Sequence, residues 1–300
     1  MPLIKTNDNV TLYCETNGSS DLPPLILLHG FTSSGAVFLR NVEALSRNHY
    51  VVVPDLRGHG FSDKTKSGYH VARLALDLKN VIDYFQFKVG TISAIGTSLG
   101  AAILWSYCEL FTTEDFKSLI FVDQAPLQNY LSDWGAAFGN RGCNSAEALQ
   151  AFQKQLLDDP KAAHLGTINA CLAYRYAPQP GDFSESSPEW KADEEFFLSE
   201  ALKGDPWWYG KLMADHTALD WRDSIAQSFG ENSGSTTRVL VVASTRSGCF
   251  PAAGPLKVQE LASAESVTVE WGGHWCYWEQ PDLFNEVAIR FLLQGRSGSV

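Results

Sequence analysis

The chain has 300 residues, of which 45% are hydrophobic and 19% are charged. This composition supplies enough apolar side chains for a large core and excludes a chain that is mainly disordered. Acidic residues outnumber basic ones by 34 to 23 and no Lys/Arg-rich run occurs, so neither nucleic acid nor an anionic membrane surface is expected as a partner.

Residues 1–10 lack the basic segment and following apolar run of a secretory signal. The longest apolar runs, such as 25–28 and 239–243, are far shorter than the roughly 18 residues that a membrane span needs. We therefore expect a cytoplasmic protein with no membrane partner.

Short apolar runs separated by amphipathic stretches dominate the first 125 residues. Residues 10–16 follow an Asn-Asp-Asn turn and are expected to form one arm of an antiparallel hairpin. Residues 71–87 carry apolar side chains at three-to-four spacing, which predicts a helix packed on a sheet. Four further runs are apolar throughout, as in strands covered on both faces: 25–28, 51–53, 91–95 and 119–122.

The pattern changes after residue 126. Between 127 and 221 no strand-like run occurs, and several helix signals follow one another. Asn144-x-x-Glu147 resembles a capping box, and Ser187-Pro188 offers an N-cap with proline at the first helical position. Strand-like runs return at 239–243 and 267–270, and a closing helix is predicted at 283–293.

These elements predict an α/β protein with a doubly wound, mostly parallel sheet and one helical insertion. Residues 1–126 and 231–300 would form the core. Residues 127–230 would form the insertion, because a helical stretch between two halves of one sheet is simpler than a tandem second domain.

Gly96-Thr97-Ser98-Leu99-Gly100 directly follows a predicted strand and precedes a helix. This is the context that the G-x-S-x-G pattern requires. The glycines leave room for a tight turn that exposes the Ser98 hydroxyl on a strained backbone. We interpret Ser98 as a nucleophile, and the alternative is an ordinary glycine-rich turn.

A serine nucleophile needs a general base and hydrogen-bond donors for the oxyanion. His274 follows two glycines just past the last predicted strand, and it is our candidate base. The Phe31 amide, which follows the first parallel strand, is expected to pair with the Leu99 amide as the oxyanion hole. Gly30 would give the backbone room, and His29 is interpreted as a structural side chain rather than a base.

Four motifs occur in a characteristic order along the chain. They are HGF at 29–31, PDLRGHGFS at 54–62, the GTSLG turn around Ser98, and GH at 273–274 followed by EQP at 279–281. On these motifs, which span nearly the whole chain apart from the insertion, it resembles the α/β-hydrolases. Within that superfamily it looks like the small lidded esterases, lactonases and cofactor-free haloperoxidases.

The resemblance implies ester-type acyl transfer through Ser98, with no metal and no other cofactor. It makes the insertion a cap over the site. It also makes residues 55–62 a structural loop beside the site, so His59 is not expected to be catalytic.

The acid of the expected triad is missing from its usual place. In the family it usually follows the strand predicted at 239–243, but residues 244–251 contain no carboxylate. Some relatives place the acid after the preceding core strand, where this chain has Asp123. We therefore predict that Asp123 orients the histidine, with Glu270 and Asp215 as weaker candidates. The alternative is a structural Asp123, as in relatives that carry both acids.

Aromatic residues are frequent in the insertion and near His274. Most are expected to pack the cap onto the sheet, and Trp134, Trp208 and Trp275 are candidates for lining an apolar substrate pocket. Arg246 lies in the loop that usually holds the acid. It could bind a substrate carboxylate or pair with a surface acid, and the second role is the one we expect.

Six cysteines lie far apart in the sequence. They form no C-x-x-C pair and have no histidine at a metal-binding spacing, so neither a zinc site nor a redox motif is predicted. Buried thiols in a reducing compartment are the expected state of Cys14, Cys108, Cys143, Cys171, Cys249 and Cys276.

These observations favour a cofactor-independent serine hydrolase that cleaves a small hydrophobic ester or lactone through an acyl-enzyme. Perhydrolysis, or hydrolytic cleavage of a carbon–carbon bond at the same site, is the first alternative. A ligand receptor on a hydrolase scaffold is the second, and it is the alternative that the empty acid position would predict.

Overall fold

The structure, a computed structural model, describes residues 1–294 of the chain. Its centre is an eight-stranded sheet with the order β1-β2-β4-β3-β5-β6-β7-β8. β2 runs antiparallel to its two neighbours, whereas β3 to β8 are parallel to one another, as the sequence predicted. The strands are β1 (Leu3–Lys5), β2 (Thr11–Asn17), β3 (Pro24–Leu28), β4 (Tyr50–Pro54), β5 (Ile92–Thr97), β6 (Phe116–Val122), β7 (Arg238–Ser244) and β8 (Glu265–Val269).

The parallel strands are covered on both faces, which explains why they are apolar throughout. In β3, Ile26 and Leu28 belong to one buried cluster, and Leu25 and Leu27 belong to a second cluster, because successive side chains of a strand point to opposite faces. The first cluster receives side chains from α2 (Val71–Phe85), α3 (Leu99–Leu110), α9 (Arg222–Phe229) and α10 (Ala253–Ala262). The second receives them from η1 (Gly35–Phe38), α1 (Val42–Ser46), α11 (Cys276–Glu279) and α12 (Pro281–Leu293).

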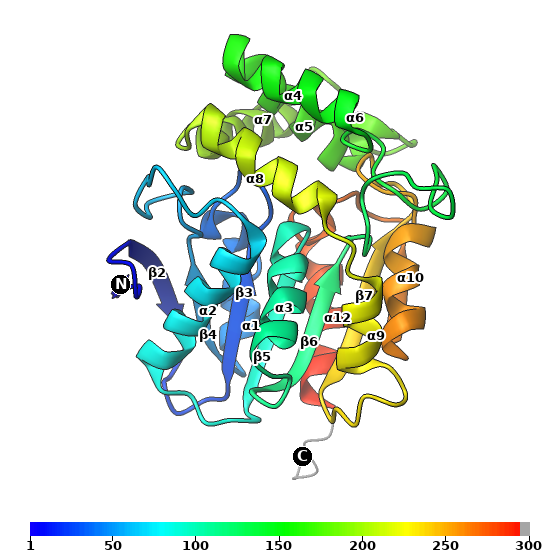
Figure 1. Cartoon of the computed structure of the whole chain (residues 1–300). Coiled ribbons are helices and arrows are strands. Elements are labelled where there is room, and N and C mark those ends of the chain that lie inside the picture. The colour runs from blue at the N-terminus through cyan, green and yellow to red at the C-terminus, as the bar shows by residue number, and fades with distance from the viewer. Residues whose placement is uncertain (295–300) are drawn as a thin grey trace.

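A group of helices lies above the carboxyl ends of the parallel strands (Figure 1). Its members are α4 (Ala146–Asp158), α5 (Pro160–Cys171), α6 (Ala173–Tyr176), α7 (Pro188–Ala201) and α8 (Pro206–Ala218), which we call the cap helices. α7 begins as predicted, because the Ser187 hydroxyl accepts a hydrogen bond from the Trp190 amide and Pro188 follows it. α4 begins one residue later than predicted, since Ser145 rather than Asn144 caps it.

The helical insertion ends earlier than the sequence suggested. We expected it to extend to residue 230, but α9 packs against α3 and α10 beside the sheet. Its buried side chains Ile225 and Phe229 join the cluster on the sheet face. The cap helices therefore end with α8, and α9 belongs to the core. None of the described helices has the length and apolar character that crossing a bilayer requires.

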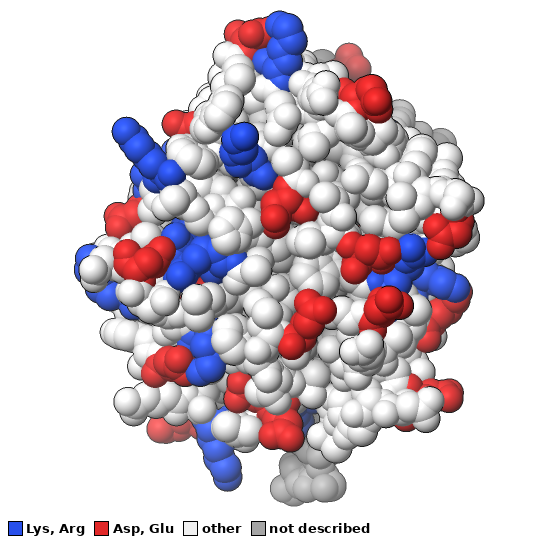
Figure 2. All heavy atoms as spheres, in the orientation of Figure 1, with Lys and Arg blue, Asp and Glu red and all other residues white. Residues whose placement is uncertain are grey.

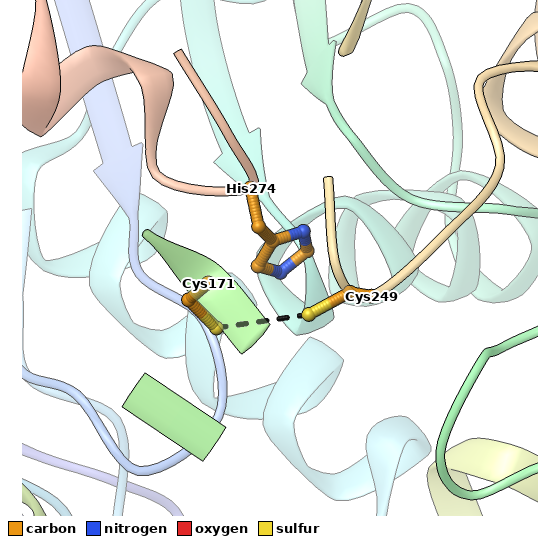
Figure 3. Close-up of side chains that lie close together, drawn as sticks. All are labelled: Cys171, Cys249 and His274. Carbon is orange, nitrogen blue, oxygen red and sulfur yellow. Dashed lines mark hydrogen bonds between the residues drawn. The ribbon is translucent and has the colours of Figure 1, made fainter. Parts of the chain in front are cut away.

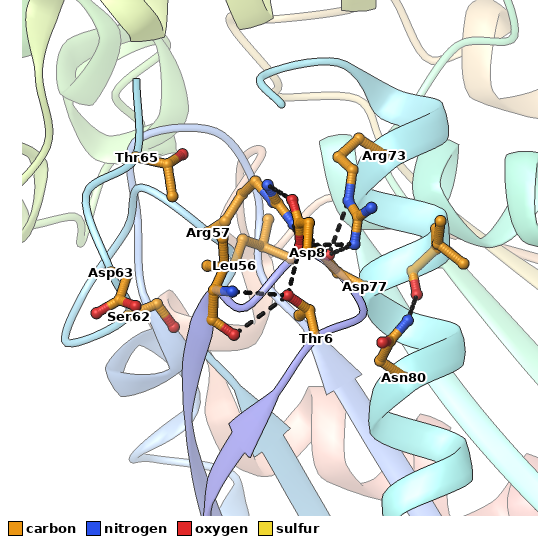
Figure 4. A network of polar contacts seen from close by, with 12 residues as sticks. Thr6, Asp8, Leu56, Arg57, Ser62, Asp63, Thr65, Arg73, Asp77 and Asn80 are labelled. Atoms are coloured by element: carbon orange, nitrogen blue, oxygen red, sulfur yellow. Dashed lines mark hydrogen bonds and ion pairs between the residues drawn. The ribbon is translucent and has the colours of Figure 1, made fainter. Parts of the chain in front are cut away.

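The loop after β4 is held by a buried ion-pair network (Figure 4). The Arg57 side chain is fully buried and donates to both carboxylate oxygens of Asp77, at 2.6 and 2.7 Å, and to Asp8 at 2.9 Å. The Arg57 guanidinium holds the pKa of Asp8 well below its usual range. The neighbouring Leu56 amide donates to Nε2 of His29 at 3.0 Å, which ties this loop to the end of β3.

On the face shown in Figure 2, basic side chains lie among acidic ones. Arg222, for example, pairs with both Asp133 and Asp220 at 2.6 Å.

Candidate active site

Ser98 lies on the sharp turn between β5 and α3, as predicted for the G-x-S-x-G segment. Its backbone has φ 53° and ψ −120°, a conformation that costs free energy for a residue with a side chain. The flanking glycines make this turn possible. A Cβ atom on Gly96 would lie 2.5 Å from the Gly100 oxygen, and one on Gly100 would lie 2.3 Å from the Leu28 oxygen. The turn exposes Ser98 to a cavity beneath the cap helices.

His274 and Asp123 form a buried pair at the wall of the same cavity. Nδ1 of His274 donates a hydrogen bond to Oδ2 of Asp123 at 2.7 Å. Asp123 directly follows β6 and is fully buried. Its second oxygen accepts a hydrogen bond from the Ser244 amide at 3.1 Å. The carboxylate is thus fixed on both oxygens, and Nε2 is the ring nitrogen of His274 that Asp123 does not engage.

The competing acids lie elsewhere. Asp215 accepts a hydrogen bond from the Val71 amide at 2.8 Å, at the start of α2, and Glu270 is exposed. In the loop after β7, Arg246 pairs with Asp182 of the insertion and donates to the Ala177 oxygen at 2.9 Å. Arg246 therefore makes a protein contact, which is the role we expected for it.

Two cysteines meet beside His274 (Figure 3). Sγ of Cys171, the last residue of α5, lies 3.6 Å from Sγ of Cys249 in the loop after β7. Contact with Cys171 and with His274 lowers the pKa of Cys249 to about 6. Burial lowers the pKa of His274, but the Cys249 sulfur and the Asp123 carboxylate outweigh burial and raise it to about 10.

Glu279 supports the loop that carries His274. Its carboxylate accepts from the Gly273 amide at 2.5 Å and from the Ala173 amide, in the cap, at 2.9 Å. Burial raises the pKa of Glu279 to about 7. In the sequence, Glu279 stood out only as part of the EQP motif at 279–281. Its contacts connect the cap to the loop that carries His274.

The segment after β3 approaches Ser98 closely. A Cβ atom on Gly30 would lie 3.1 Å from Cβ of Ser98, so glycine leaves room for the next backbone amide, that of Phe31. Leu99 is the first residue of α3, where the amide has no acceptor within the helix. His29 uses both ring nitrogens, one toward the Gly30 oxygen and one toward the Leu56 amide, which fits its structural interpretation.

The cavity is small, about 60 Å³. Phe31, Met213, Phe250 and Trp275 give it apolar walls, while polar groups come from Gln128, Asn140, Thr167 and His216. Burial lowers the pKa of His216 to about 3, and its Nδ1 has no hydrogen-bond partner among the described residues. No sequence motif marks these polar residues, and all four lie in the stretch predicted as the insertion.

Two of the three tryptophans expected in the pocket lie outside it. Trp134 is buried, donates its indole N–H to the Leu127 oxygen at 2.9 Å and stacks on Phe138. Trp208 stacks on Tyr69 with ring centroids 5.3 Å apart. Trp208 thus packs the insertion against the core, and Trp134 belongs to a buried cluster with Ala125 and Phe250 of the core. Trp275 alone of the three lines the cavity.

The Ser98 hydroxyl donates to Oε1 of Gln124 at 3.4 Å, a long contact. Ser98 and His274 face one cavity, and the His274–Asp123 pair is already formed. A serine, a buried histidine and a carboxylate that fixes the histidine are the groups that nucleophilic acyl transfer requires.

Comparisons with known proteins agree with this architecture. A family model described as alpha/beta hydrolase fold matches residues 23–281. The AB hydrolase superfamily protein YisY of Bacillus subtilis is 26% identical over 96% of this chain and 97% of its own. A pimeloyl-[acyl-carrier protein] methyl ester esterase of Xanthomonas campestris is 26% identical, covering 90% of this chain and 95% of its own. The structure of an esterase from Exiguobacterium antarcticum superposes with a TM-score of 0.82 at 18% identity, over 97% of this chain and 98% of that one.

Proposed function

Because the chain belongs to the alpha/beta hydrolase fold family, we propose that it is a cofactor-independent serine hydrolase that cleaves a small hydrophobic ester or lactone through an acyl-enzyme. The observation that carries the proposal is the 2.7 Å hydrogen bond between His274 and Asp123 beside the cavity that Ser98 faces. The names of the esterase relatives support an ester bond as the target.

The reaction begins with attack of the Ser98 oxygen on the substrate carbonyl carbon, while Nε2 of His274 takes the hydroxyl proton. To attack, Ser98 must exchange its 3.4 Å contact with Gln124 for one with His274. Asp123 holds the ring with Nδ1 protonated and stabilises the imidazolium that forms. The amides of Phe31 and Leu99 donate to the oxyanion.

His274 then returns the proton to the alcohol that leaves, and Ser98 keeps the acyl group. A water molecule, deprotonated by His274, attacks this acyl-enzyme and releases the acid. When the substrate is a lactone, the alcohol and the acid are two ends of one product. Acylation and deacylation each begin with neutral His274, so its raised pKa moves the active range toward alkaline pH.

The cavity favours a small acyl group. Its volume of about 60 Å³ is well below the roughly 300 Å³ at which ligand pockets usually begin. Thr167 and Cys171 of α5 and Met213 and His216 of α8 form part of its wall. A longer acyl chain therefore requires the cap helices to move, and short acyl chains should react best.

A phosphonate ester of p-nitrophenol tests the proposal directly, because it phosphonylates an activated serine and releases a coloured product. We expect one equivalent of p-nitrophenol and one covalent adduct on Ser98, located by mass spectrometry of peptides. Ser98→Ala should form no adduct, and Ser106→Ala, which changes a buried serine within α3, should react like the parent. An adduct on another residue, or binding without release of p-nitrophenol, would contradict the proposal and favour a ligand receptor.

A further inference from the structure

We propose that Cys171, Cys249 and His274 form a binding site for a thiophilic divalent cation such as Zn²⁺, and that occupation of this site switches off the hydrolase. The binding part rests on the cluster alone. The inhibition part rests on the proposed function, because the cation would occupy the histidine that serves there as the base.

The two cysteine sulfurs are spaced as they would be around one tetrahedral ion. One possible ligand atom from each of the three residues lies within 4.8 Å of the other two. The two sulfurs are 3.6 Å apart. With Zn–S bonds of about 2.3 Å and a tetrahedral angle, two thiolate ligands stand about 3.8 Å apart. The sulfurs thus need almost no movement to take up one ion.

The imidazole is already oriented for such a ligand. Asp123 accepts a hydrogen bond from Nδ1 at 2.7 Å, so Nε2 is the nitrogen available to a metal. A carboxylate behind a histidine in this way fixes the tautomer and strengthens the ligand in metal sites. The Ser244 amide donates to the other oxygen of Asp123 at 3.1 Å, so both carboxylate oxygens have a hydrogen-bond partner.

The donor set selects the class of cation. Two sulfurs and one imidazole nitrogen suit Zn²⁺, Co²⁺ or Cd²⁺ and disfavour Mg²⁺ and Ca²⁺, which prefer oxygen ligands. Because a metal binds thiolate and neutral imidazole ligands, binding competes with protons on the ligand atoms, and metal affinity should rise with pH.

The position of the cluster explains how binding would inhibit. Cys171 comes from the cap helices, while Cys249 and His274 come from two loops of the core. All three line the cavity with Ser98. A bound cation would take Nε2 away from Ser98 and would also tie the cap to the core over a cavity that has to admit substrate.

Cobalt binding gives a readout that does not depend on activity. The protein is fully reduced, its free thiols are counted, and Co²⁺ is added without oxygen. We expect one equivalent to produce a sulfur-to-cobalt charge-transfer band and the visible bands of a tetrahedral ion, and Zn²⁺ to abolish them. Cys171→Ser and Cys249→Ser should each weaken Co²⁺ binding at least tenfold. Cys108→Ala, in α3 outside the cavity, is the control and should bind like the parent.

Inhibition is measured with p-nitrophenyl acetate, and each variant is compared with its own metal-free rate. One equivalent of Zn²⁺ should lower the parent rate at least tenfold, EDTA should restore it, and Mg²⁺ should have no effect. The two serine variants should resist Zn²⁺. Circular dichroism and thermal unfolding of each variant establish that it is folded, and Cys171→Ala and Cys249→Ala replace any variant that is not.

The outcomes separate the two proposals. A reduced parent without a sulfur-to-cobalt band overturns the site, and so do serine variants that bind Co²⁺ as the parent does. Zn²⁺ inhibition that persists unchanged in both variants overturns the switch. A parent that binds one Co²⁺ through its cysteines but cleaves no ester leaves the site standing and refutes the proposed function.

Discussion

Oδ2 of Asp123 accepts a 2.7 Å hydrogen bond from Nδ1 of His274 across 151 positions of sequence. Asp123 directly follows β6 and has φ 47°. In the proteins that this chain resembles, the acid usually follows the next core strand, which is β7 here. The second oxygen of Asp123 is held by the Ser244 amide, at the end of β7. The neighbouring strand thus helps to fix the carboxylate without supplying one.

The turn at Ser98 should tolerate no side chain at Gly100. In Gly100→Ala the new Cβ would meet the Leu28 backbone oxygen at 2.3 Å, so the turn or β3 must shift. We expect a loss of about 1–3 kcal/mol in the free energy of unfolding, and a loss of hydrolysis. Urea unfolding measures the first quantity.

Gly166→Ala is the matched control. Gly166 lies within α5, and a Cβ there would meet no atom within 4 Å. Because alanine is the better helix former, this variant should gain about 0.5–1 kcal/mol. Equal stability of the two alanine variants would refute the close approach at Gly100.

The ion pairs of Arg57 should be essential for stability. In Asp77→Ala the fully buried Arg57 guanidinium loses its buried partner. Among the network residues of Figure 4, its remaining acidic partner is the partly exposed Asp8. We expect this substitution to cost about 3–5 kcal/mol, because an uncompensated buried charge is expensive. Lys154→Ala removes an exposed pair with Asp158 and should cost less than about 1 kcal/mol. Thermal unfolding compares the two, and a cost below 1 kcal/mol for Asp77→Ala would contradict the account.

The pH dependence of hydrolysis should depend on Cys249. Neutral His274 is the active base, and its pKa is raised toward about 10, so kcat/KM should increase with pH well above the ordinary value of 6.5. Cys249→Ala removes a sulfur that favours the protonated ring. The rise of kcat/KM should then occur at lower pH, and the variant should be faster than the parent near pH 7.

Profiles of kcat/KM for p-nitrophenyl acetate between pH 5 and pH 10 test this, with Ser98→Ala as the correction for background hydrolysis. Cys108→Ala should follow the parent, since Cys108 does not line the cavity. If Cys249→Ala also follows the parent, the Cys249 sulfur does not control the charge of His274.

Met213 should limit the length of the acyl group. It lines the small cavity from α8. In Met213→Ala, kcat/KM for p-nitrophenyl butyrate should rise relative to that for the acetate by roughly tenfold or more, because each buried methylene contributes about 0.8 kcal/mol. Trp207→Ala changes a half-exposed residue of the same helix and should leave the ratio unchanged. An unchanged ratio in Met213→Ala would show that substrate does not occupy this side of the cavity.

The sequence predicted the sheet and the turn at Ser98 because both depend on local rules. A parallel strand covered on both faces must be apolar throughout, as β3 is, and the Ser98 turn requires glycine at positions 96 and 100. The proximity of Asp123 to His274 followed from topology, since both residues come from loops at the carboxyl edge of one parallel sheet.

Contacts between the cap and the core were beyond such rules. Cys171 and Cys249 are 78 positions apart, and no local spacing relates a cap helix to a loop of the core. The same limit explains the errors at Trp134 and Trp208, because composition shows that aromatic residues are present but not which way they face. The sequence also placed the end of the insertion at residue 230, whereas α9 packs beside the sheet, because α8 and α9 follow each other with no strand between them.

The most direct test of the central claim is the rate of ester hydrolysis by Asp123→Asn, with Glu270→Gln as the control for loss of an exposed carboxylate. An asparagine holds His274 in the wrong tautomer, so kcat for p-nitrophenyl acetate should fall by about 10⁴-fold in a folded protein, while Glu270→Gln should match the parent. An Asp123→Asn variant that retains a third or more of the parent kcat would show that His274 works without Asp123 and would contradict the account.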